Sequence, residues 1–458
     1  MQKTKKQHAV DMCNGPLFSK IVVFFIPVML SNLLQLVYNA ADQMIVGKFA
    51  GATDLAAVGS TMALINLIIC TVVGLSVGVS SVTARHFGAG NNASLTRTVH
   101  TAVALSLIIG VFLAIVGILC SKSLLVMMDT PKDVLPKAVL YMQILFLGLP
   151  HVTLFNFTSA ILRAVGDTKR PMLFMILSGV LNVFLNMLFV IVFDMAVAGV
   201  ALATIISQFL SAFLTVRCLI TSDEGYKLNL KSVKIYKGEL RQIIQIGIPS
   251  SIQSASFSLS NVFIQSAVNS FGSAAMAGST TSSTIENLVY QSTNSLYHTI
   301  LSFVGQNYGA GKKDRIIKSV LYSVIIVTVM GLTIGLVCVA CSDFLMTLFL
   351  DKAADPAFYK EALAYGAERL KLVLPFYFIC GIMEVATGAL RAINKSGFSM
   401  VGSIVGACGM RIVWILTIFA AAPSMRILFM SYPVTWILTS IFLYGMFIYF
   451  MRKMPNQK

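Results

Sequence analysis

Twelve apolar stretches, each long enough to cross a bilayer, constrain this chain more than any other feature of its sequence. A transmembrane helix needs about 20 predominantly apolar residues. The twelve stretches lie at 17–46, 55–82, 96–120, 134–159, 171–193, 196–219, 241–269, 274–304, 316–341, 362–388, 397–421 and 427–451. Only 11% of the residues are charged, where a soluble domain carries about 25%. Because continuous apolar runs exclude the alternating strands of a barrel, the sequence predicts an all-α integral membrane protein with twelve transmembrane helices.

The second half of the chain repeats landmarks of the first half in the same order. Pro249 follows Pro27 by 222 positions, Tyr308 follows Phe87 by 221, Pro375 follows Pro150 by 225, and Arg391 follows Arg163 by 228. Each repeat holds six spans, so both halves enter the membrane from the same side. We therefore expect two parallel six-helix lobes, related by a pseudo-twofold axis along the membrane normal, with the substrate site where the halves meet.

The most hydrophilic connection gives the domain boundaries. Charged residues concentrate at 221–240. The sequence therefore predicts an N-lobe at 1–220, a cytoplasmic linker at 221–240 and a C-lobe at 241–458.

The net charge of +16 follows the expected membrane orientation. If the N-terminus is cytoplasmic, 24 of the 34 lysines and arginines fall in inner segments, and Arg391 is among them. Nine fall in outer segments, including Arg369, and only Arg411 lies within a helix. Because basic residues favour the cytoplasmic side, we expect a multi-pass plasma membrane protein with both termini in the cytoplasm, and no role in nucleic-acid binding.

The cysteines and the remaining polar residues predict no catalytic or metal centre. The eight cysteines lie mostly in apolar segments, and Cys338-x-x-Cys341 has no second pair or histidine cluster beside it. No nucleophile–base set is evident, so we expect neither an enzyme nor a cofactor. Residues 1–16 are polar and the following apolar run has full span length, so it is expected to remain as the first helix.

Five ionisable residues lie at membrane depth or near it, where burial is costly and function is the default hypothesis. They are Asp42, Asp194, Glu286, Glu384 and Arg411. Asp194 lies at the outer end of its helix and is expected to be interfacial. Asp42, flanked by Asn39 and Gln43, is placed to hold a proton or Na⁺, because hard cations prefer oxygen ligands. Asn39 and Gln43 themselves are expected to help bind the substrate. The alternative for Asp42 is a capping role at the outer interface.

The two glutamates and a pair of asparagines add further candidates. Glu286 and Glu384 are expected to face a cavity and attract a cationic substrate, and the alternative is a structural ion pair with Arg411. Asn182 and Asn186 are four residues apart and share one helix face. They either complete a polar pocket with Asp42 or hydrogen-bond between helices.

The mismatches between the repeats favour chemistry for two of the acids. At an offset of 222, Asn39 pairs with Asn261 and Gln43 with Gln265, but Asp42 pairs with Ile264. At an offset of 228, Glu384 pairs with Asn156. An acid that is present in one copy alone is not needed for the shared scaffold.

These motifs together resemble the multidrug and toxic compound extrusion family of cation-coupled efflux transporters. The resemblance covers nearly the whole chain and rests on Ile26-Pro27, residues 39–47, Gly88-Ala89-Gly90, residues 162–169, residues 199–204, residues 303–311 and Gly388-Ala389-Leu390-Arg391. It implies two six-helix lobes in which entry of H⁺ or Na⁺ drives a cationic or amphipathic small molecule out of the cell. It also implies a chain that works in the lipid bilayer as a monomer.

The resemblance also implies roles for particular residues. Asp42, Asn156, Asn182 and Thr204 match the family's N-lobe cation site, with Na⁺ at Asp42 in Na⁺-coupled members. Asn186 stands where the family usually has an aspartate, a departure that removes one negative charge and favours a proton carried by Asp42 alone. Glu286 and Glu384 resemble acids that other members place on these helices.

Three classes of function are compatible with a duplicated helix bundle. A flippase for lipid-linked anionic substrates is the main alternative to the antiporter, and it should line its cleft with Arg or Lys. The sequence offers only Arg411 at depth against Asp42, Glu286 and Glu384, which favours cationic cargo and antiport. A channel is disfavoured because no filter-like repeat is evident.

Overall fold

The computed structural model describes residues 9–350 and 355–455, and every regular element in them is a helix. The first half contains α1 (Leu17–Ile45), η1 (Val46–Ala50), α2 (Ala52–Gly88), α3 (Asn92–Met127), α4 (Leu135–Leu147), α5 (Leu149–Ala164), α6 (Lys169–Met187), η2 (Leu188–Val192), α7 (Ala196–Ile220) and η3 (Leu230–Ser232). The second half begins with α8 (Lys237–Asn269), α9 (Ser273–Gly309), α10 (Lys313–Ala340) and α11 (Ser342–Phe349). It continues with α12 (Pro356–Val373), η4 (Leu374–Phe376), α13 (Tyr377–Ala392), α14 (Ser396–Ser403), η5 (Ile404–Gly409), α15 (Met410–Trp414), η6 (Ile415–Phe419) and α16 (Met425–Lys453).

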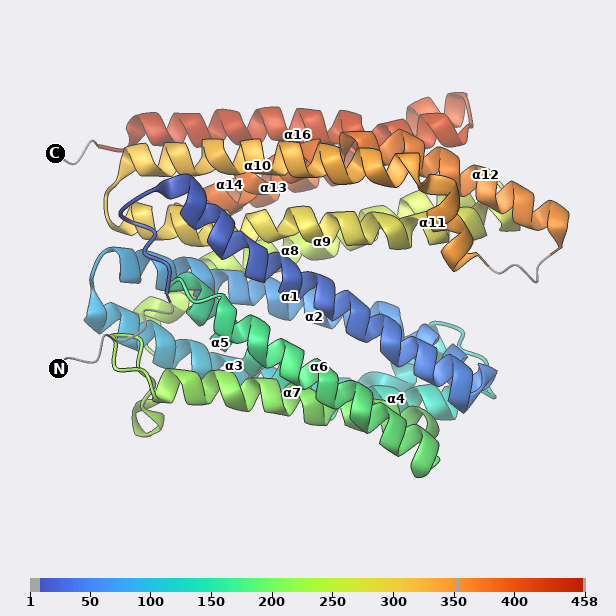
Figure 1. The fold of residues 1–458 in the computed structure, drawn as a ribbon, viewed down its shortest axis with the longest axis horizontal. Coiled ribbons are helices and arrows are strands. Elements are labelled where there is room, and N and C mark those ends of the chain that lie inside the picture. Colours follow the sequence, from blue (N-terminus) through green and yellow to red (C-terminus); the bar gives the residue numbers. More distant parts are fainter. Residues whose placement is uncertain (1–8, 351–354, 456–458) are drawn as a thin grey trace. The chain divides into compact units, whose positions relative to one another are not determined.

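The predicted twelve-helix membrane fold is confirmed (Figure 1). In the described part of the chain, nine helices are long and apolar enough to cross a membrane. The bent pair α4–α5 makes a tenth span, with a break of 45°. The remaining two predicted spans are α8 and α9, which are 33 and 37 residues long but more polar than the others.

Serine and threonine give α8 and α9 much of their polarity, and their hydroxyls can be satisfied inside the helix. Their hydroxyls donate to carbonyls of their own helix, as Ser282 does to Gly278 O at 2.8 Å and Ser295 to Gln291 O at 2.8 Å. A hydroxyl that is satisfied in this way can be buried in an apolar environment. These two helices therefore fit a membrane protein in spite of their low mean hydropathy.

The chain forms two compact units. The N-terminal unit comprises Ile26–Ser251 together with the described residues up to Met12, and the C-terminal unit comprises Ile252 onward together with Cys13–Phe25. Two helices therefore contribute to both units, because α1 and α8 each change unit along their length. Pro27 and Pro249 lie inside these two helices, within two residues of the change.

The turn before α2 and its counterpart before α9 show that the repeat extends to backbone conformation. Gly51 precedes α2 with φ +96°, and Gly272 precedes α9 with φ +97°. Both residues adopt a conformation that side chains with a Cβ rarely reach. The two halves therefore enter their second helix through the same turn.

The connection between α7 and α8 is held on the N-terminal unit by hydrogen bonds to α3. Thr96 Oγ1 donates to Gly225 O at 2.8 Å, and His100 Nε2 accepts from the Asn229 amide at 3.1 Å. The Tyr236 amide donates to Thr101 Oγ1 at 3.1 Å. The predicted linker at 221–240 is thus an ordered part of this unit, and its cytoplasmic location stays a prediction.

Two arginines that the charge count assigned to segments outside the membrane core are buried inside helices. Arg369 is in α12 and Arg391 is in α13, and each is 5% exposed. The charge count assigned Arg369 to an outer segment and Arg391 to an inner one, because each lies near an end of the predicted span at 362–388. Arg411 is therefore not the sole arginine buried in the described helices, and the interior carries more positive charge than the sequence predicted.

Candidate functional site

Asp42 on α1 is the centre of a polar cluster inside the N-terminal unit. The Asn186 amide on α6 donates to Asp42 Oδ1 at 2.5 Å, and the Thr204 hydroxyl on α7 donates to Asp42 Oδ2 at 3.4 Å. Asn182 donates to Thr204 Oγ1 at 3.5 Å and accepts from the Asn186 amide at 3.3 Å. Four of the five residues predicted for cation coupling are thus brought together from three helices.

Helix geometry and one glycine place these side chains. Asn182 and Asn186 are one helical turn apart, so both project from the same face of α6. One turn earlier, Gly179 leaves room for the ring of Tyr38 from α1, since a Cβ there would lie 1.8 Å from Tyr38 Cζ. Tyr38 also donates to Ile176 O at 3.4 Å. Gly179 therefore lets α1 approach α6 closely enough for Asp42 to reach the asparagines.

The cluster borders a small cavity of about 30 Å³. Its lining residues are Gln35, Tyr38, Asn39, Asp42, Phe155, Met175, Ser178, Gly179, Asn182, Thr204, Ser207, Gln208 and Ser211. This volume is large enough to hold a small ion or water. Asn186 does not line the cavity, but its Oδ1 is buried without a hydrogen-bond partner among the described residues. The available ligands are carboxylate, amide and hydroxyl oxygens, which suit Na⁺, and the carboxylate also suits a proton.

Two predicted residues make their contacts elsewhere. The Asn156 amide donates to Val152 O of its own helix at 2.8 Å, and no contact with Asp42 is observed. Gln43 Nε2 contacts Met62 Sδ at 3.7 Å. Asn39 lines the cavity and accepts from Gln35 at 3.4 Å. The positions of Asn156 and Gln43 were inferred from helix membership and neighbourhood, which do not fix the direction of a side chain.

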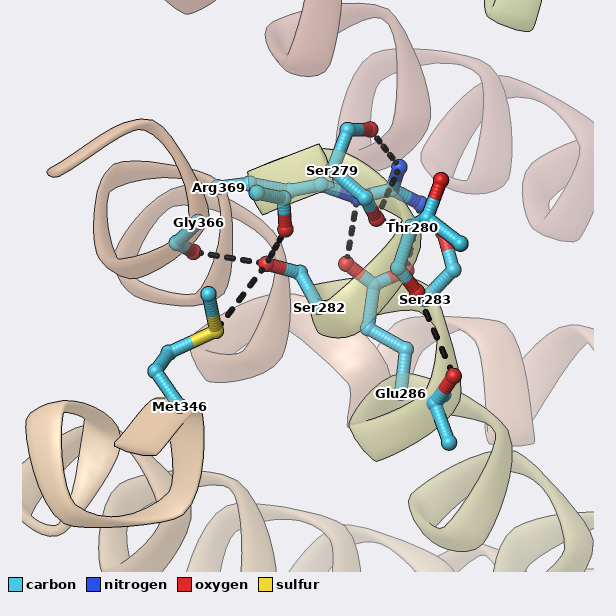
Figure 2. Close-up of polar contacts among 10 residues, drawn as sticks. Ser279, Thr280, Ser282, Ser283, Glu286, Met346, Gly366 and Arg369 are labelled. Carbon is cyan, nitrogen blue, oxygen red and sulfur yellow. Dashed lines mark hydrogen bonds and ion pairs between the residues drawn. The ribbon is translucent and has the colours of Figure 1, made fainter. Parts of the chain in front are cut away.

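Glu286 in the C-terminal unit forms a two-pronged ion pair with Arg369, joining α9 to α12 (Figure 2). Arg369 Nε donates to Glu286 Oε1 at 2.7 Å and Nη2 donates to Oε2 at 2.9 Å. Arg369 Nη1 also donates to Ser279 Oγ at 2.5 Å, and the guanidinium lies 4.9 Å from the centre of the Phe429 ring. The partner of Glu286 is therefore Arg369 and not Arg411, and the charge of this carboxylate is balanced within the unit.

The N-terminal unit has an ion pair between the equivalent helices, but at another level. At the repeat offsets of 221 and 225, Glu286 and Arg369 correspond to Ile65 and Ile144, which pack against an apolar core. Asp54 and Lys137 pair at 2.6 Å between α2 and α4, where the C-terminal unit has Ala275 and Ala362. Glu286 lies eleven residues beyond Ala275, which is about 16 Å along a helix. Each unit thus joins the same two helices with one ion pair at a different depth.

Glu384 on α13 is buried, 7% exposed, and makes no hydrogen bond or ion pair with any residue the structure describes. Arg391, two turns further along α13, donates to Tyr297 Oη on α9 and to Gln253 Oε1 on α8, the latter at 2.7 Å. Glu384 is not paired with Arg411 among the described residues. Of the two acids predicted to bind substrate, Glu384 is the one whose charge is left without a direct partner.

A larger pocket, of about 520 Å³, opens at the surface of the C-terminal unit, and its walls come from α11, α12 and the start of α16. In Figure 1, α11 is the short helix that follows α10 and lies at a steep angle to it. The pocket's charged residues are Asp343, Lys360, Glu368, Lys371 and Arg426. None of the predicted site residues lines it.

Sequence reasoning missed Arg369, Ser279 and Tyr38. The one signal for Arg369 was the general requirement that a buried Glu286 have a cation near it, which does not identify the partner. Ser279 lies seven residues before Glu286, two turns away on the same helix face. Tyr38 had no signal beyond its position one turn before Asp42.

The fold matches a solved structure described as an outward-facing multidrug resistance MATE family transporter of the MOP superfamily. The TM-score is 0.90 at 25% identity, covering 99% of this chain and 100% of that one. A twelve-helix membrane fold with a polar cavity inside one of its halves is thus that of a multi-pass membrane transporter.

The matching family model and the similar proteins indicate the same class, a membrane transporter. The MatE family model matches residues 27–188 and 249–417, and the chain belongs to the MatE family. It is 27% identical to the probable multidrug resistance protein YpnP of Bacillus subtilis over 84% of each chain. It is 21% identical to the multidrug export protein MepA of Staphylococcus aureus over 88% of each chain.

Proposed function

We propose that this protein is a secondary active exporter of cationic, amphipathic small molecules that takes up H⁺ or Na⁺ in exchange. The observation that carries the proposal is the Asp42 cluster, where one carboxylate meets only neutral partners beside a cavity of about 30 Å³. The names of the relatives YpnP and MepA, a multidrug resistance protein and a multidrug export protein, support the substrate class and the direction.

The cluster binds one positive charge at a time. Asn186 and Thr204 donate hydrogen bonds to Asp42 but cannot neutralise it. A single proton or Na⁺ on the carboxylate brings the cluster to neutrality, so each transport cycle exchanges one coupling cation at this position. A second carboxylate at Asn186 would have raised that number.

Cation binding changes the contacts between α1 and two other helices. A proton on Asp42 Oδ1 would place an O–H donor against the N–H of Asn186, so Asn186 would have to turn its own oxygen toward Asp42 to accept from it. Na⁺ would instead draw the oxygens of Asp42, Asn182, Asn186 and Thr204 toward itself. In either case the connections of α1 to α6 and α7 are remade. Because α1 belongs to both compact units, this local change can drive alternating access.

Glu384 is the residue we assign to the positive charge of the transported molecule. Its carboxylate is buried and unpaired among described residues, and an unpaired carboxylate at low dielectric attracts a cation strongly. Glu286 is a weaker candidate for this role, because Arg369 already balances its charge.

The decisive experiment measures ethidium transport in proteoliposomes under separately imposed H⁺ and Na⁺ gradients. The wild-type protein is expected to respond to one of the gradients, and Asp42→Asn is expected to abolish the response. Asp194→Asn is the matched control, because Asp194 lies in the turn between η2 and α7, outside the cluster. Retained gradient-driven transport in Asp42→Asn would overturn the coupling assignment. Lipid translocation without any ion gradient would instead indicate a flippase.

We also propose a plasma membrane location, cytoplasmic termini and a monomeric transporter. The excess of basic residues in the expected inner segments supports the orientation.

A further inference from the structure

Arg411 on α15 is a buried cation without a counter-charge in the described part of the chain. It is 2% exposed and is the largest of the fully buried side chains. Its guanidinium lies 4.2 Å from the centre of the Tyr432 ring on α16, and its Nε has no hydrogen-bond partner among the residues that the structure describes. Neither buried glutamate of the C-terminal unit pairs with Arg411. Glu286 binds Arg369, and Glu384 makes no ion pair with any described residue. A buried charge without a partner is costly and is retained for a function.

The helix around Arg411 departs from regular α geometry on both sides. The π-helical segments η5 and η6 flank the five residues of α15. In the N-terminal unit, the equivalent helix α6 is followed by η2 but contains no π-helical segment of its own. Such segments occur frequently at functional sites, because they re-aim side chains within a helix.

The repeat identifies the counterpart of Arg411 in the cation site. The first residue of α16, Met425, follows the first residue of α7, Ala196, by 229 positions, whereas Arg391 follows Arg163 by 228. A π turn holds one residue more than an α turn, and α6 has no counterpart of η5. Placing one extra residue at η5 gives an offset of 229 there and aligns Arg411 with Asn182.

The C-terminal unit has residues of a different charge at the two positions that are aligned with Asp42 and Asn182. Asp42 corresponds to Ile264 at an offset of 222, so the acid is replaced by an apolar side chain. Asn182 corresponds to Arg411, so a neutral amide is replaced by a permanent positive charge. The position aligned with Asn182 of the Asp42 cluster thus carries a permanent positive charge in the C-terminal unit.

We propose that Arg411 binds the carboxylate of a transported molecule. This inference rests on the proposed transport function and adds a second recognition element to it, so that molecules with both an amine and a carboxylate become substrates. The Tyr432 ring makes a cation–π contact with the guanidinium at 4.2 Å, and Arg411 Nε has no hydrogen-bond partner among the described residues, so this N–H is left to donate to a ligand. The N–H edge of a guanidinium matches a planar carboxylate, which can accept two parallel hydrogen bonds from Nε and Nη.

The test compares an acid with its ester on the purified full-length protein. The probes are para-aminomethylbenzoic acid and its methyl ester, which share the amine and the ring but differ in the negative charge. Binding is read as ligand-induced thermal stabilisation in detergent, so the result does not depend on ion coupling. Arg411→Gln is expected to raise the concentration of acid needed for half-maximal stabilisation about ten- to hundredfold. The value for the ester should change less than about twofold.

Two further variants keep the test decisive. Arg411→Lys keeps the positive charge but loses the paired N–H donors of the guanidinium. We therefore expect an intermediate loss of binding for the acid and no loss for the ester. Arg426→Gln, which changes an exposed arginine at the start of α16, should leave both probes unaffected. An equal loss for acid and ester in Arg411→Gln would show a structural role and overturn the proposal. No difference between acid and ester in the wild-type protein would also overturn it.

A chloride titration at matched ionic strength tests the nature of the anion. Stabilisation by chloride equal to that by the acid would overturn the carboxylate assignment, whereas stabilisation by the acid alone supports it. Failure of the transport function is recognised separately, by wild-type proteoliposomes that export neither the ester nor ethidium under any gradient.

Discussion

The ion pair of Glu286 and Arg369 can be tested separately for its contribution to stability and for a role in transport. The reason is that the first half of the chain has apolar residues at the equivalent positions. Ile65 and Ile144 occupy the equivalent positions of the first half. Removing one partner of a buried ion pair typically costs about 3–5 kcal/mol, because the other charge is left uncompensated. Replacing both partners by apolar residues is often neutral.

We therefore expect Arg369→Ile to destabilise the protein by about 3–5 kcal/mol and the double variant Glu286→Ile/Arg369→Ile to recover most of that loss. Thermal unfolding of the purified protein measures both changes. A double variant as unstable as the single one would show that the pair is needed for folding. If stability recovers but transport does not, the pair acts in the transport cycle.

Asn186 offers a test of ion choice at the cation site. Its amide lies 2.5 Å from Asp42 Oδ1, so Asn186→Asp would place a second carboxylate against the first. An added oxygen ligand with a negative charge favours binding of a hard metal cation. Transport by Asn186→Asp should therefore depend more strongly on a Na⁺ gradient, relative to a H⁺ gradient, than wild-type transport. Unchanged dependence on the two gradients would show that Asn186 does not contact the coupling ion.

At the scale of elements, the two helices that belong to both compact units carry the prolines that begin the repeat. Proline inside a helix removes one backbone hydrogen bond and weakens the helix locally. Pro27 in α1 and Pro249 in α8 lie within two residues of the point where each helix changes unit. These positions are therefore expected to bend during transport.

Pro27→Ala and Pro249→Ala should each lower the initial rate of ethidium uptake into proteoliposomes severalfold without lowering thermal stability. Straightening the helix restores a hydrogen bond but removes a point of bending. Pro433→Ala is the control, because Pro433 lies inside α16, which belongs wholly to the C-terminal unit. A similar loss of rate in all three variants would argue against a special role for the two shared helices.

At the scale of the whole molecule, orientation is the property that remains to be measured. Lys132 lies between α3 and α4, and Lys231 lies in the connection between α7 and α8. Both side chains are exposed. In a background with the eight native cysteines replaced by alanine, Lys132→Cys should react with a membrane-impermeant maleimide added to intact cells. Lys231→Cys should react after permeabilisation only. The opposite pattern would reverse the predicted orientation.

The fold was predictable from the sequence because a membrane imposes length and apolarity on each span. The duplicated landmarks then fixed the number of spans per half. The grouping of Asp42, Asn182, Asn186 and Thr204 was also predictable, since these four side chains meet in the structure, while their role in cation coupling stays a prediction. Asn156 belongs to a neighbouring helix, yet its amide bonds to its own backbone. Side-chain direction of this kind depends on packing that a sequence pattern does not contain.

Charged pairs were the least predictable part. Arg369 and Glu286 are 83 residues apart in the sequence. Arg369 lies near the start of a span that contains several other charges, so it was counted with the outer residues. Burial became evident only when α9 and α12 were seen to pack together.

The displaced ion pairs have a consequence for how the chain can have evolved. After a gene duplication the two copies are redundant, and each can lose what the other keeps. Here one copy holds Asp54 and Lys137 where the other has alanines, and the second holds Glu286 and Arg369 where the first has isoleucines. The halves have therefore ceased to be interchangeable. A tandem of two first halves would keep every backbone landmark and the cation site twice over, but it would lack every acid and arginine of the second half's interior.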